Sequence, residues 1–403
     1  MKNLVKEYIQ SGKSFADLKN EFGISGNEFE NLICLNYSQI DSPKTAPIVR
    51  QCRGLVIDRD TLDIVHYPFY RFFNLDEVVE ERTRFNWTKA VALEKIDGSL
   101  FGVFNYNGAW YITTRSQIGG GNNAGSGLKT VTFGELFDEA IGMPRDTFFT
   151  QLDATLDYTF ELAGPINKII TPYEETHLYL IAVRDKLKDF HELPVRDFVD
   201  NMPPCVRFPK QWSIMDENGE FIGFNELKAK ANGLEKPTDE GFVVVDYSPA
   251  SYDENFGFWP RLKVKNSAYV ELHRLRGEDN VMHWENILSV IWNGEKDEVL
   301  ANLPTLKEYF DEVESKLHVF ERNVDEVVNA LRTFFDMPLE ERRQAENKKA
   351  FAITINSSSA LRHYSKLLFI MYNKGKTLRE AVDELNGKNE NFFKALWNQY
   401  LNN

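Results

Sequence analysis

Apolar and polar residues along the chain follow three successive patterns. Over residues 1–32 the apolar positions fall roughly on one helical face, which predicts one or two short helices. From about 48 to 270 short β-rich runs alternate with turns, and Asn107-Gly108 predicts a hairpin because both turn positions need a positive φ. From Leu306 to Phe334 the apolar residues step by three or four, which predicts one long amphipathic helix with room for one break.

These patterns predict a mixed α+β body followed by a helical C-terminal domain. We place the first domain at 1–275, with its helical part at 1–32, and the second at 276–403. The predicted strands are 54–57, 90–93, 100–106, 110–114, 158–162, 178–183, 242–245 and 262–264, and the helices between them are 128–141 and 225–231.

Composition limits the class of protein. The chain has 403 residues, of which 42% are hydrophobic and 27% charged, which is typical of a folded globular protein. No run approaches the roughly 18 apolar residues of a membrane helix, and the N-terminus lacks an apolar signal core. The three cysteines predict neither a disulfide framework nor a zinc site. We therefore expect a cytoplasmic protein with no membrane partner.

Charge is unevenly distributed. The net charge of -14 argues by itself against a nucleic-acid partner. Residues 341–379, however, hold nine Lys or Arg against two Glu. This basic stretch predicts a local contact with a polyanion, and a solvated helix face is the alternative.

Lys95 is the first candidate for chemistry. It follows a strand-like run and precedes Asp97-Gly98-Ser99 and a further strand, so it would point into a cleft. A lysine attacks phosphorus only when it is neutral, and burial and nearby cations lower a lysine pKa. We expect cations of the site to lower the pKa of Lys95. The motif by itself is weak, and an exposed hairpin lysine is the alternative.

Four further fragments support a phosphate site. Arg53-Gly54 precedes a strand, and Glu161 and Glu240 each stand at a strand end. Lys263 and Lys265 share one strand face because side chains alternate along a strand. Two lysines on one face repel each other unless an anion lies between them, and a triphosphate is such an anion.

The order Lys-x-Asp-Gly, Phe-Glu, Glu-Gly-Phe-Val, Lys-x-Lys resembles that of DNA ligases, RNA ligases and mRNA capping enzymes. Over roughly residues 30–275 the chain resembles most closely the RNA ligase 1 family of T-even bacteriophages. Leu100 favours this family, because DNA ligases and capping enzymes usually carry Arg there. The likeness extends to Cys52-Arg53-Gly54, Pro68, Phe72-Phe73-Asn74, Lys95 to Leu100, Phe160-Glu161, Pro165, Asn167, Ile169, Val183-Arg184, Tyr269-Val270 and Leu272-His273.

The resemblance implies an antiparallel nucleotidyltransferase (adenylyltransferase) domain with the nucleotide between two sheets. It implies that Lys95 takes AMP from ATP, passes it to an RNA 5′-phosphate, and that a 3′-hydroxyl then displaces AMP and seals the strand. The implied cofactors are ATP and Mg²⁺. Implied nucleotide contacts are Tyr37, Arg53, Arg71, Glu161, Glu240, Lys263 and Lys265; implied metal ligands are Glu161, Glu240 and Asp297; Arg115 and Tyr269 match further functional positions.

Some positions depart from the family pattern. Arg71 and Arg115 stand where the family has lysine. A guanidinium group can donate two parallel hydrogen bonds, whereas the lysine ammonium is a compact point charge. A gapless alignment puts Asn36, not Tyr37, at the nucleotide-contacting tyrosine, and Asp297 aligns only after a one-residue gap. For Tyr269, packing is the alternative role.

The resemblance implies an ATP-dependent RNA ligase, phage-encoded and monomeric, that repairs RNA such as tRNA in the cytoplasm of a host cell. The C-terminal domain would select the RNA through its basic stretch. A DNA ligase or a capping guanylyltransferase is the alternative within the superfamily. A non-catalytic nucleotide- or RNA-binding module is a further alternative, and it predicts a missing central residue, whereas every central residue is present.

Overall fold

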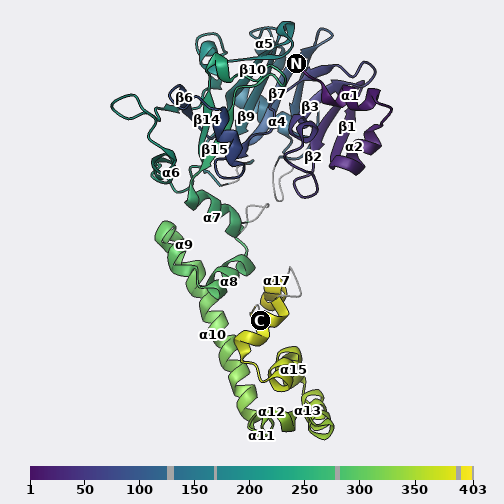
Figure 1. The fold of residues 1–403 in the computed structure, drawn as a ribbon, viewed down its shortest axis with the longest axis vertical. Helices are drawn as coiled ribbons and strands as arrows, with labels where there is room; N and C mark the ends of the chain where they lie inside the picture. Colours follow the sequence, from purple (N-terminus) through teal and green to yellow (C-terminus); the bar gives the residue numbers. More distant parts are fainter. Residues whose placement is uncertain (125–130, 168–169, 277–281, 387–391, 402–403) are drawn as a thin grey trace. The chain divides into compact units, whose positions relative to one another are not determined.

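The computed structural model describes residues 1–124, 131–167, 170–276, 282–386 and 392–401 (Figure 1). These residues form two compact units. The first runs from Met1 to His273, and the second holds the described residues from Arg274 onward. The division predicted from the sequence lies two residues further on, at 275/276, and the roles that we assign to the two domains stay predictions.

Three sheets build the first unit. The N-terminal sheet has the order β1 (Ile24–Phe29), β2 (Leu32–Tyr37), β3 (Arg53–Asp58) and β4 (Ile64–His66). The six-stranded sheet has the order β11 (His191–Leu193), β10 (His177–Asp185), β9 (Leu156–Ala163), β7 (Ser99–Tyr106) and β8 (Ala109–Thr114), with β12 (Val206–Arg207) beside β10. The five-stranded sheet has the order β13 (Gln211–Trp212), β6 (Ala90–Glu94), β14 (Gly241–Asp246), β15 (Arg261–Lys265) and β5 (Phe73–Asn74).

Neighbouring strands run antiparallel except in two short pairs, β10 with β12 and β15 with β5. Each strand segment predicted from the sequence lies within one of these strands, and the α+β class is confirmed. The hairpin at Asn107-Gly108 is also confirmed, since the two residues have φ of 51° and 82°.

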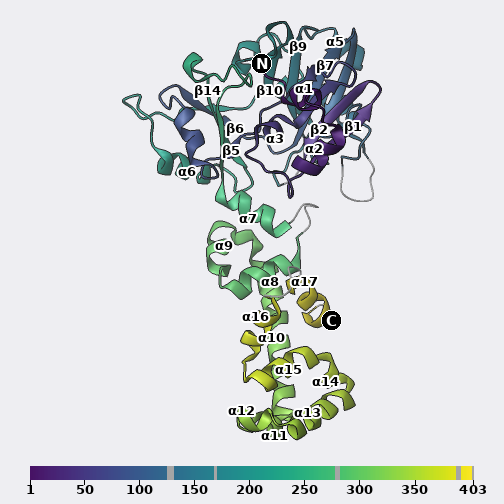
Figure 2. The same ribbon diagram turned by 45° about the vertical axis from the view of Figure 1, so that its right-hand side comes forward.

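Helices cover the outer faces of the two larger sheets (Figures 1 and 2). Leu136 and Phe137 of α4 pack in one core with Phe160 of the six-stranded sheet, and Leu227 of α6 packs in another core with Val244 of the five-stranded sheet. The inner faces of the two sheets are left to line a cavity. The helices of this unit are α1 (Leu4–Gln10), α2 (Phe15–Phe22), α3 (Pro47–Gln51), α4 (Phe133–Ile141), α5 (Arg145–Phe149), α6 (Phe224–Asn232) and the first residues of α7 (Ser267–Arg276), with short 3-10 turns at Val79–Arg84, Lys186–Lys188, Val195–Phe198 and Pro249–Ser251.

Two helix predictions need correction. The helical N-terminal part ends at Phe22, not at residue 32, because Gly23 takes a left-handed φ of 65° and the chain then enters β1. The helix predicted from residue 128 begins at Phe133, where Thr132 and Glu135 form a capping box. Residues 128–130 lie outside the described part of the chain.

The second unit is helical, as predicted. The long helix is α10, whose buried Phe310, Leu317 and Val324 form its apolar face, and it breaks once, at Leu331. Across the described ranges, every helix falls short of the length or the apolar character that a membrane crossing needs. The helices are α8 (Trp284–Asn293), α9 (Lys296–Asn302), α10 (Lys307–Ala330), α11 (Arg332–Phe335), α12 (Leu339–Arg342), α13 (Ala345–Ser357), α14 (Ser359–His363), α15 (Ser365–Lys374), α16 (Leu378–Asn386) and α17 (Phe392–Leu396), with turns at Pro304–Leu306 and Trp397–Leu401.

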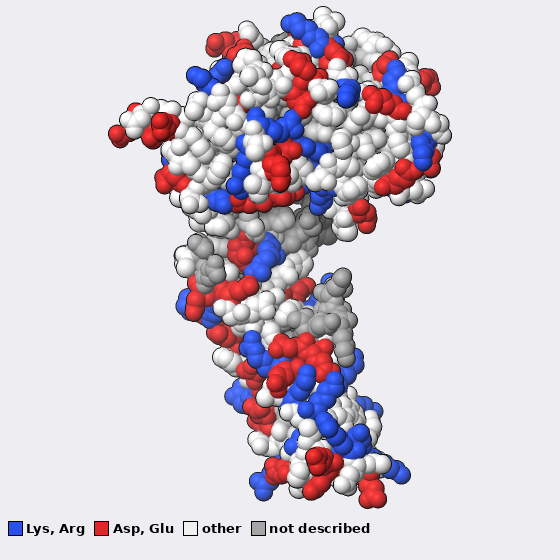
Figure 3. Space-filling view, in the orientation of Figure 1, with Lys and Arg blue, Asp and Glu red and all other residues white. Residues whose placement is uncertain are grey.

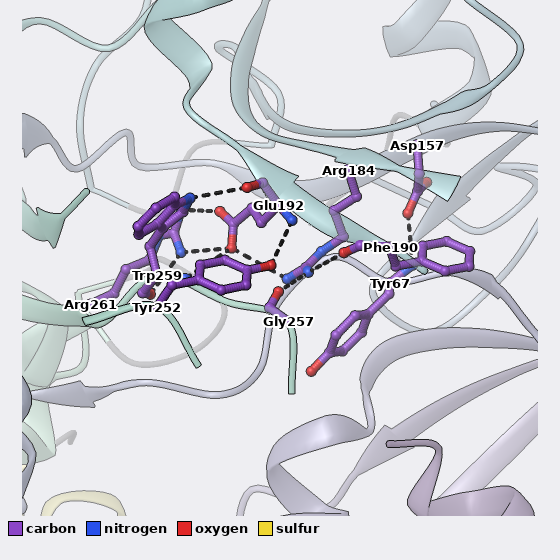
Figure 4. Close-up of polar contacts among 9 residues, drawn as sticks. All are labelled: Tyr67, Asp157, Arg184, Phe190, Glu192, Tyr252, Gly257, Trp259 and Arg261. Carbon is purple, nitrogen blue, oxygen red and sulfur yellow. Dashed lines mark hydrogen bonds and ion pairs between the residues drawn. The ribbon is translucent and has the colours of Figure 1, made fainter. Parts of the chain in front are cut away.

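A buried ionic network joins the two larger sheets (Figure 4). The Glu192 carboxylate on β11 accepts hydrogen bonds from Arg184 of β10 at 3.4 Å and from Arg261 of β15 at 3.0 Å. The Trp259 indole donates to the Glu192 carbonyl at 3.1 Å, and the Tyr252 hydroxyl accepts from the Glu192 backbone N–H at 2.9 Å. The network therefore fixes the two sheets relative to each other beside the cavity between them.

Candidate active site

A cavity of about 370 Å³ lies between the six-stranded and the five-stranded sheet. This volume is in the range of small-ligand pockets, which are mostly apolar with a few polar groups. One part of its wall is apolar and the other is charged. The apolar lining consists of Phe69, Phe72, Leu93, Ile96, Leu100, Leu180, Ile181, Val195, Val199, Phe208, Pro209, Val243 and Val245. The predicted site residues that line the cavity are Arg53, Lys95, Glu161, Glu240, Lys263 and Lys265.

Backbone geometry holds Lys95 at the cavity. Lys95 directly follows β6, and its backbone N–H donates to the Gly241 carbonyl at 2.9 Å. A side chain at Gly98 would put its Cβ 2.4 Å from the Leu162 carbonyl oxygen. Gly241 has a φ of 125°, and its Cβ would lie 2.1 Å from the Val264 carbonyl oxygen. The glycines of both motifs are therefore required by close backbone approaches beside the lysine.

Asp97 anchors the turn that follows Lys95. Its buried carboxylate accepts backbone hydrogen bonds from Ile170 at 2.7 Å and Thr171 at 2.6 Å, and the Tyr269 hydroxyl donates to it at 2.9 Å. Tyr269 is thus linked through Asp97 to the turn that follows Lys95. Asp97 was not among the predicted site residues, although its place in the motif was a signal, because its partners are distant in sequence.

Two glutamates surround the Lys95 amine. Lys95 Nζ donates to Glu240 Oε2 at 2.5 Å, and Lys265 Nζ lies 2.9 Å from Glu240 Oε1. Burial acts to lower the pKa of Lys95, but the negative charges of Glu240, Glu161 and Asp97 outweigh it and raise the pKa above its usual value. The prediction that neighbouring cations lower this pKa is therefore wrong, because the carboxylates are the closer charges.

The two glutamates differ in protonation. Burial raises the pKa of Glu161 to about 7, despite the opposing positive charges of Lys95 and Arg53. Burial also opposes ionisation of Glu240, but Lys95 and Lys265 hold its pKa below the usual value. Near neutral pH the Glu240 side chain is therefore ionised, whereas the Glu161 side chain is protonated in part of the molecules.

Lys263 is a partly buried cation that repels its neighbours. Burial, and then the positive charges of Arg53, Lys95, Arg71 and Lys265, lower its pKa well below the usual value. Its Nζ lies 5.0 Å from the centre of the Phe72 ring, and no carboxylate among the described residues pairs with it. An unpaired buried cation is costly unless an anion binds beside it.

The remaining predicted cations form a group next to Arg53. Arg115 donates to Asn36 Oδ1 at 3.0 Å and stacks on the Tyr37 ring at 4.9 Å, so both candidate residues of β2 contact it. Burial and the charge of Arg53 lower the pKa of Arg115. Arg71 pairs with Glu77 at 2.7 Å, and its buried Nη1 has no hydrogen-bond partner in the described part of the chain. Within this group only Arg53 is in the cavity lining.

Few side chains of the cavity could bind a metal ion. The described residues contain no group of three or more His, Cys, Asp or Glu side chains that could hold a metal. Three glutamates line the cavity, Glu94, Glu161 and Glu240, and of these Glu161 and Glu240 are the predicted ligands. Asp297 is an exposed residue of α9 in the second unit, and its role as a ligand stays a prediction.

Residues of the apolar wall were not predicted as site residues. Phe72 lines the cavity whereas Phe73 is core, so the two neighbouring aromatics divide between the two roles. Arg261 also lines the cavity and belongs to the Glu192 network. Sequence reasoning had a signal for Phe72 in its motif, but none for Arg261, because its partner Glu192 lies in another sheet.

Comparisons with known proteins agree with the motif order. A protein described as a bifunctional polynucleotide kinase/RNA ligase of Autographa californica nuclear polyhedrosis virus is 30% identical over 296 residues, covering 69% of this chain and 38% of the relative. An RNA ligase of Rhodothermus phage RM378 is 26% identical over 272 residues, covering 56% of this chain and 60% of the relative. The chain therefore spans less than two thirds of the length of either relative.

A solved structure of an archaeal ATP-dependent RNA ligase aligns with a TM-score of 0.44 and 16% identity, covering 75% of this chain and 78% of that one. The sequence pattern of a family described as RNA ligase matches residues 51–269, which is more than half of the chain. This match includes Lys95, Glu161, Glu240, Lys263 and Lys265. The resemblance predicted from the motifs is confirmed, and the chain belongs to the T4 RNA ligase 1 family.

Proposed function

We propose that this protein is an ATP-dependent RNA ligase that joins an RNA 5′-phosphate to a 3′-hydroxyl through AMP bound covalently to Lys95. The observation that carries the proposal is the arrangement around Lys95. Its amine faces a nucleotide-sized cavity with an apolar wall on one side and Glu240, Lys263 and Lys265 on the other.

In the first step Lys95 Nζ attacks the α-phosphorus of ATP. A P–N bond forms, the bond from the α-phosphorus to the bridging oxygen breaks, and pyrophosphate leaves with the electron pair. The apolar wall would hold the base, and Arg53, Lys263 and Lys265 would hold the phosphates and stabilise the charge of the transition state. Before attack Lys95 must lose its proton, because only the neutral amine is a nucleophile.

In the second step an oxygen of the RNA 5′-phosphate attacks the AMP phosphorus, the P–N bond breaks, and Lys95 takes up a proton as it leaves. In the third step an RNA 3′-hydroxyl attacks the 5′-phosphorus, loses its proton, and displaces AMP. Each step is a phosphoryl-type transfer, so positioning and charge do most of the work.

A divalent cation fits the cavity. Glu161 and Glu240 would hold it, since Mg²⁺ is commonly bound by one or two carboxylates together with substrate phosphates and water. Such a cation offsets the charge of the triphosphate and of the carboxylates that raise the pKa of Lys95. We propose Mg²⁺ as the ion and Asp297 as a further ligand.

Labelling with α-³²P-ATP and Mg²⁺ tests the proposal. We expect a radiolabelled protein whose label is released by pyrophosphate, and no label on Lys95→Ala. The control is Lys89→Ala, which removes an exposed lysine just before β6 and should label as the wild type does. A folded wild-type protein that never labels would sink the proposal.

Two other activities are tested in the same experiment. A capping guanylyltransferase would take label from GTP in preference to ATP, and a DNA ligase would seal nicked duplex DNA in preference to RNA. Our proposal requires ATP as donor and 5′-phosphorylated RNA as acceptor.

The second unit would select the RNA. In the basic stretch 341–379, Lys374 and Lys376 pair with Glu384, whereas five other cations are exposed: Arg343, Lys348, Lys349, Arg362 and Lys366. Figure 3 shows Lys and Arg atoms on the part of this unit that contains α13 and α15. These exposed cations suit an RNA backbone.

We propose tRNA as the natural substrate, the cytoplasm of a host cell as the site of action and a monomer as the active form. The double variant Lys348→Glu/Lys349→Glu should keep AMP labelling of Lys95 but raise the RNA concentration needed for sealing. A sealing profile identical to that of the wild type across tRNA and short RNA would contradict the role of the second unit.

A further inference from the structure

A second hollow opens beside the cavity. It has a volume of about 400 Å³ and shares Lys263 and Lys265 with the cavity, but Lys95 does not line it. We call it the outer groove. Its other charged or titratable lining residues are Asp76, Lys228, Tyr269 and His273. In Figures 1 and 2, α6, β15 and the start of α7 lie side by side where these residues come from.

The outer groove carries positive charges that are only weakly paired with carboxylates of the protein. Lys228 is 43% exposed and pairs at 2.6 Å with Asp76, which is itself 57% exposed and also bonds Arg82. A pair this exposed is weak, so an incoming anion can compete for Lys228. Lys263, at the boundary with the cavity, has no ion-pair partner among the described residues. The His273 ring lies 6.4 Å from the Tyr269 ring and reaches the same hollow.

The chemistry of the proposed function requires one phosphate site to serve twice. In phosphoryl transfer the attacking and leaving groups lie roughly in line through phosphorus. When Lys95 attacks ATP, pyrophosphate leaves on the side away from Lys95. When RNA then attacks the Lys95-bound AMP, its 5′-phosphate must enter on that same side. The outer groove lies beyond Lys263 and Lys265 and lacks Lys95, so it is the hollow that meets this requirement.

We propose that the outer groove binds pyrophosphate as it leaves and then the 5′-phosphate end of the RNA, with Lys228 and His273 holding the phosphates beyond Lys263. The proposal rests on the proposed function. In the RNA step an RNA phosphate oxygen bonds to the AMP phosphorus, the P–N bond breaks, and the electron pair returns to Lys95 Nζ, which takes up a proton. Lys228 and His273 form and break no bond in this step.

The test uses full-length protein loaded with AMP on Lys95 and measures two reactions. One is AMP transfer to a 5′-phosphorylated RNA oligonucleotide as the RNA concentration is varied. The other is resynthesis of ATP as inorganic pyrophosphate is varied. For Lys228→Ala and for His273→Ala we expect the RNA KM and the half-maximal pyrophosphate concentration each to rise about tenfold, in line with a lost hydrogen bond to a charged group.

The readout is the ratio of these effects to the effect on AMP labelling at saturating ATP, which should change far less than either KM. Lys230→Ala is the matched control, because it removes a lysine from the same helix that does not line the outer groove. An increase in the RNA KM without an increase for pyrophosphate would overturn a shared site, and so would unchanged values for both. A wild type that never accepts AMP would instead overturn the proposed function.

Discussion

The first unit holds two buried ionic clusters, and they differ in how their charges are matched. In the Glu192 network, Arg184 and Arg261 direct their guanidinium groups to one carboxylate and to backbone carbonyls, and of their nitrogens only Arg184 Nε is buried without a hydrogen-bond partner among the described residues (Figure 4). In the cavity, Lys263 is surrounded by other cations that lower its pKa. A buried charge with its partners present holds a fold together, whereas one without a partner indicates a ligand site.

Glu192→Ala gives the largest expected effect on stability. It leaves two buried guanidinium groups without their carboxylate, which costs about 3–5 kcal/mol of unfolding free energy. Urea unfolding measures the change. Glu175→Ala is the control, because Glu175 is 76% exposed and its pairs with His177 and Arg207 are weak; its expected cost is below about 1 kcal/mol. Equal costs for the two variants would break the comparison.

Lys263→Met should act in the opposite direction on stability. Removing an unpaired, partly buried cation should raise the unfolding free energy of the ligand-free protein by roughly 1 kcal/mol. The same change should slow AMP labelling of Lys95 by about 100- to 1000-fold, since a charge that stabilises the transition state is lost. Lys89→Met is the surface control. A loss of stability comparable to that of Glu192→Ala would show that Lys263 is structural.

The sequence was sufficient to predict features that follow from the spacing of neighbouring residues. Alternation along a strand placed Lys263 and Lys265 on one face, and both line the cavity. Alternation also put Leu262 and Val264 on the other face, and both pack in the core with α6. The turn at Asn107-Gly108 followed in the same way from neighbouring residues.

The sequence was insufficient where the effect depends on distant partners. The sign of the Lys95 pKa shift is set by Glu240, 145 residues away, which no local pattern reveals. Asp97 is anchored by backbone groups 73 and 74 residues away. The helical part predicted over residues 1–32 ends early, because residues 24–29 pair with β2 as a strand.

Glu161 and Glu240 are expected to change the free energy of unfolding with pH in opposite directions. The pKa of Glu161 is raised from 4.5 to about 7, so the folded protein binds the extra proton and loses stability as pH rises through this window. Relative to the wild type, Glu161→Gln should therefore gain unfolding free energy between about pH 4.5 and 7 and no more above it.

Glu240 provides the contrast, because its lowered pKa means that the wild type loses stability as pH falls through the folded-state pKa. Relative to the wild type, Glu240→Gln should gain at acid pH instead. Denaturant unfolding of the three proteins from pH 8 down to well below 4.5, the usual pKa of the Glu240 carboxyl, measures both slopes. Parallel curves for the wild type and Glu161→Gln would contradict the assignment of a raised pKa to Glu161.

Tyr269→Phe gives the smallest expected effect. It tests whether the hydrogen bond from Tyr269 to Asp97 helps to position Lys95 at the cavity. The change keeps the ring but removes the hydroxyl that donates to Asp97 at 2.9 Å. A lost hydrogen bond to a carboxylate costs about 1.5 kcal/mol, so AMP labelling of Lys95 should slow about tenfold through kcat, with the ATP KM little changed. If Tyr269 only packs, Tyr269→Phe labels at the wild-type rate and only Tyr269→Ala is impaired. The split between the two substitutions decides whether Tyr269 belongs with the Glu192 network, as a structural residue, or with Lys95, as a positioning residue.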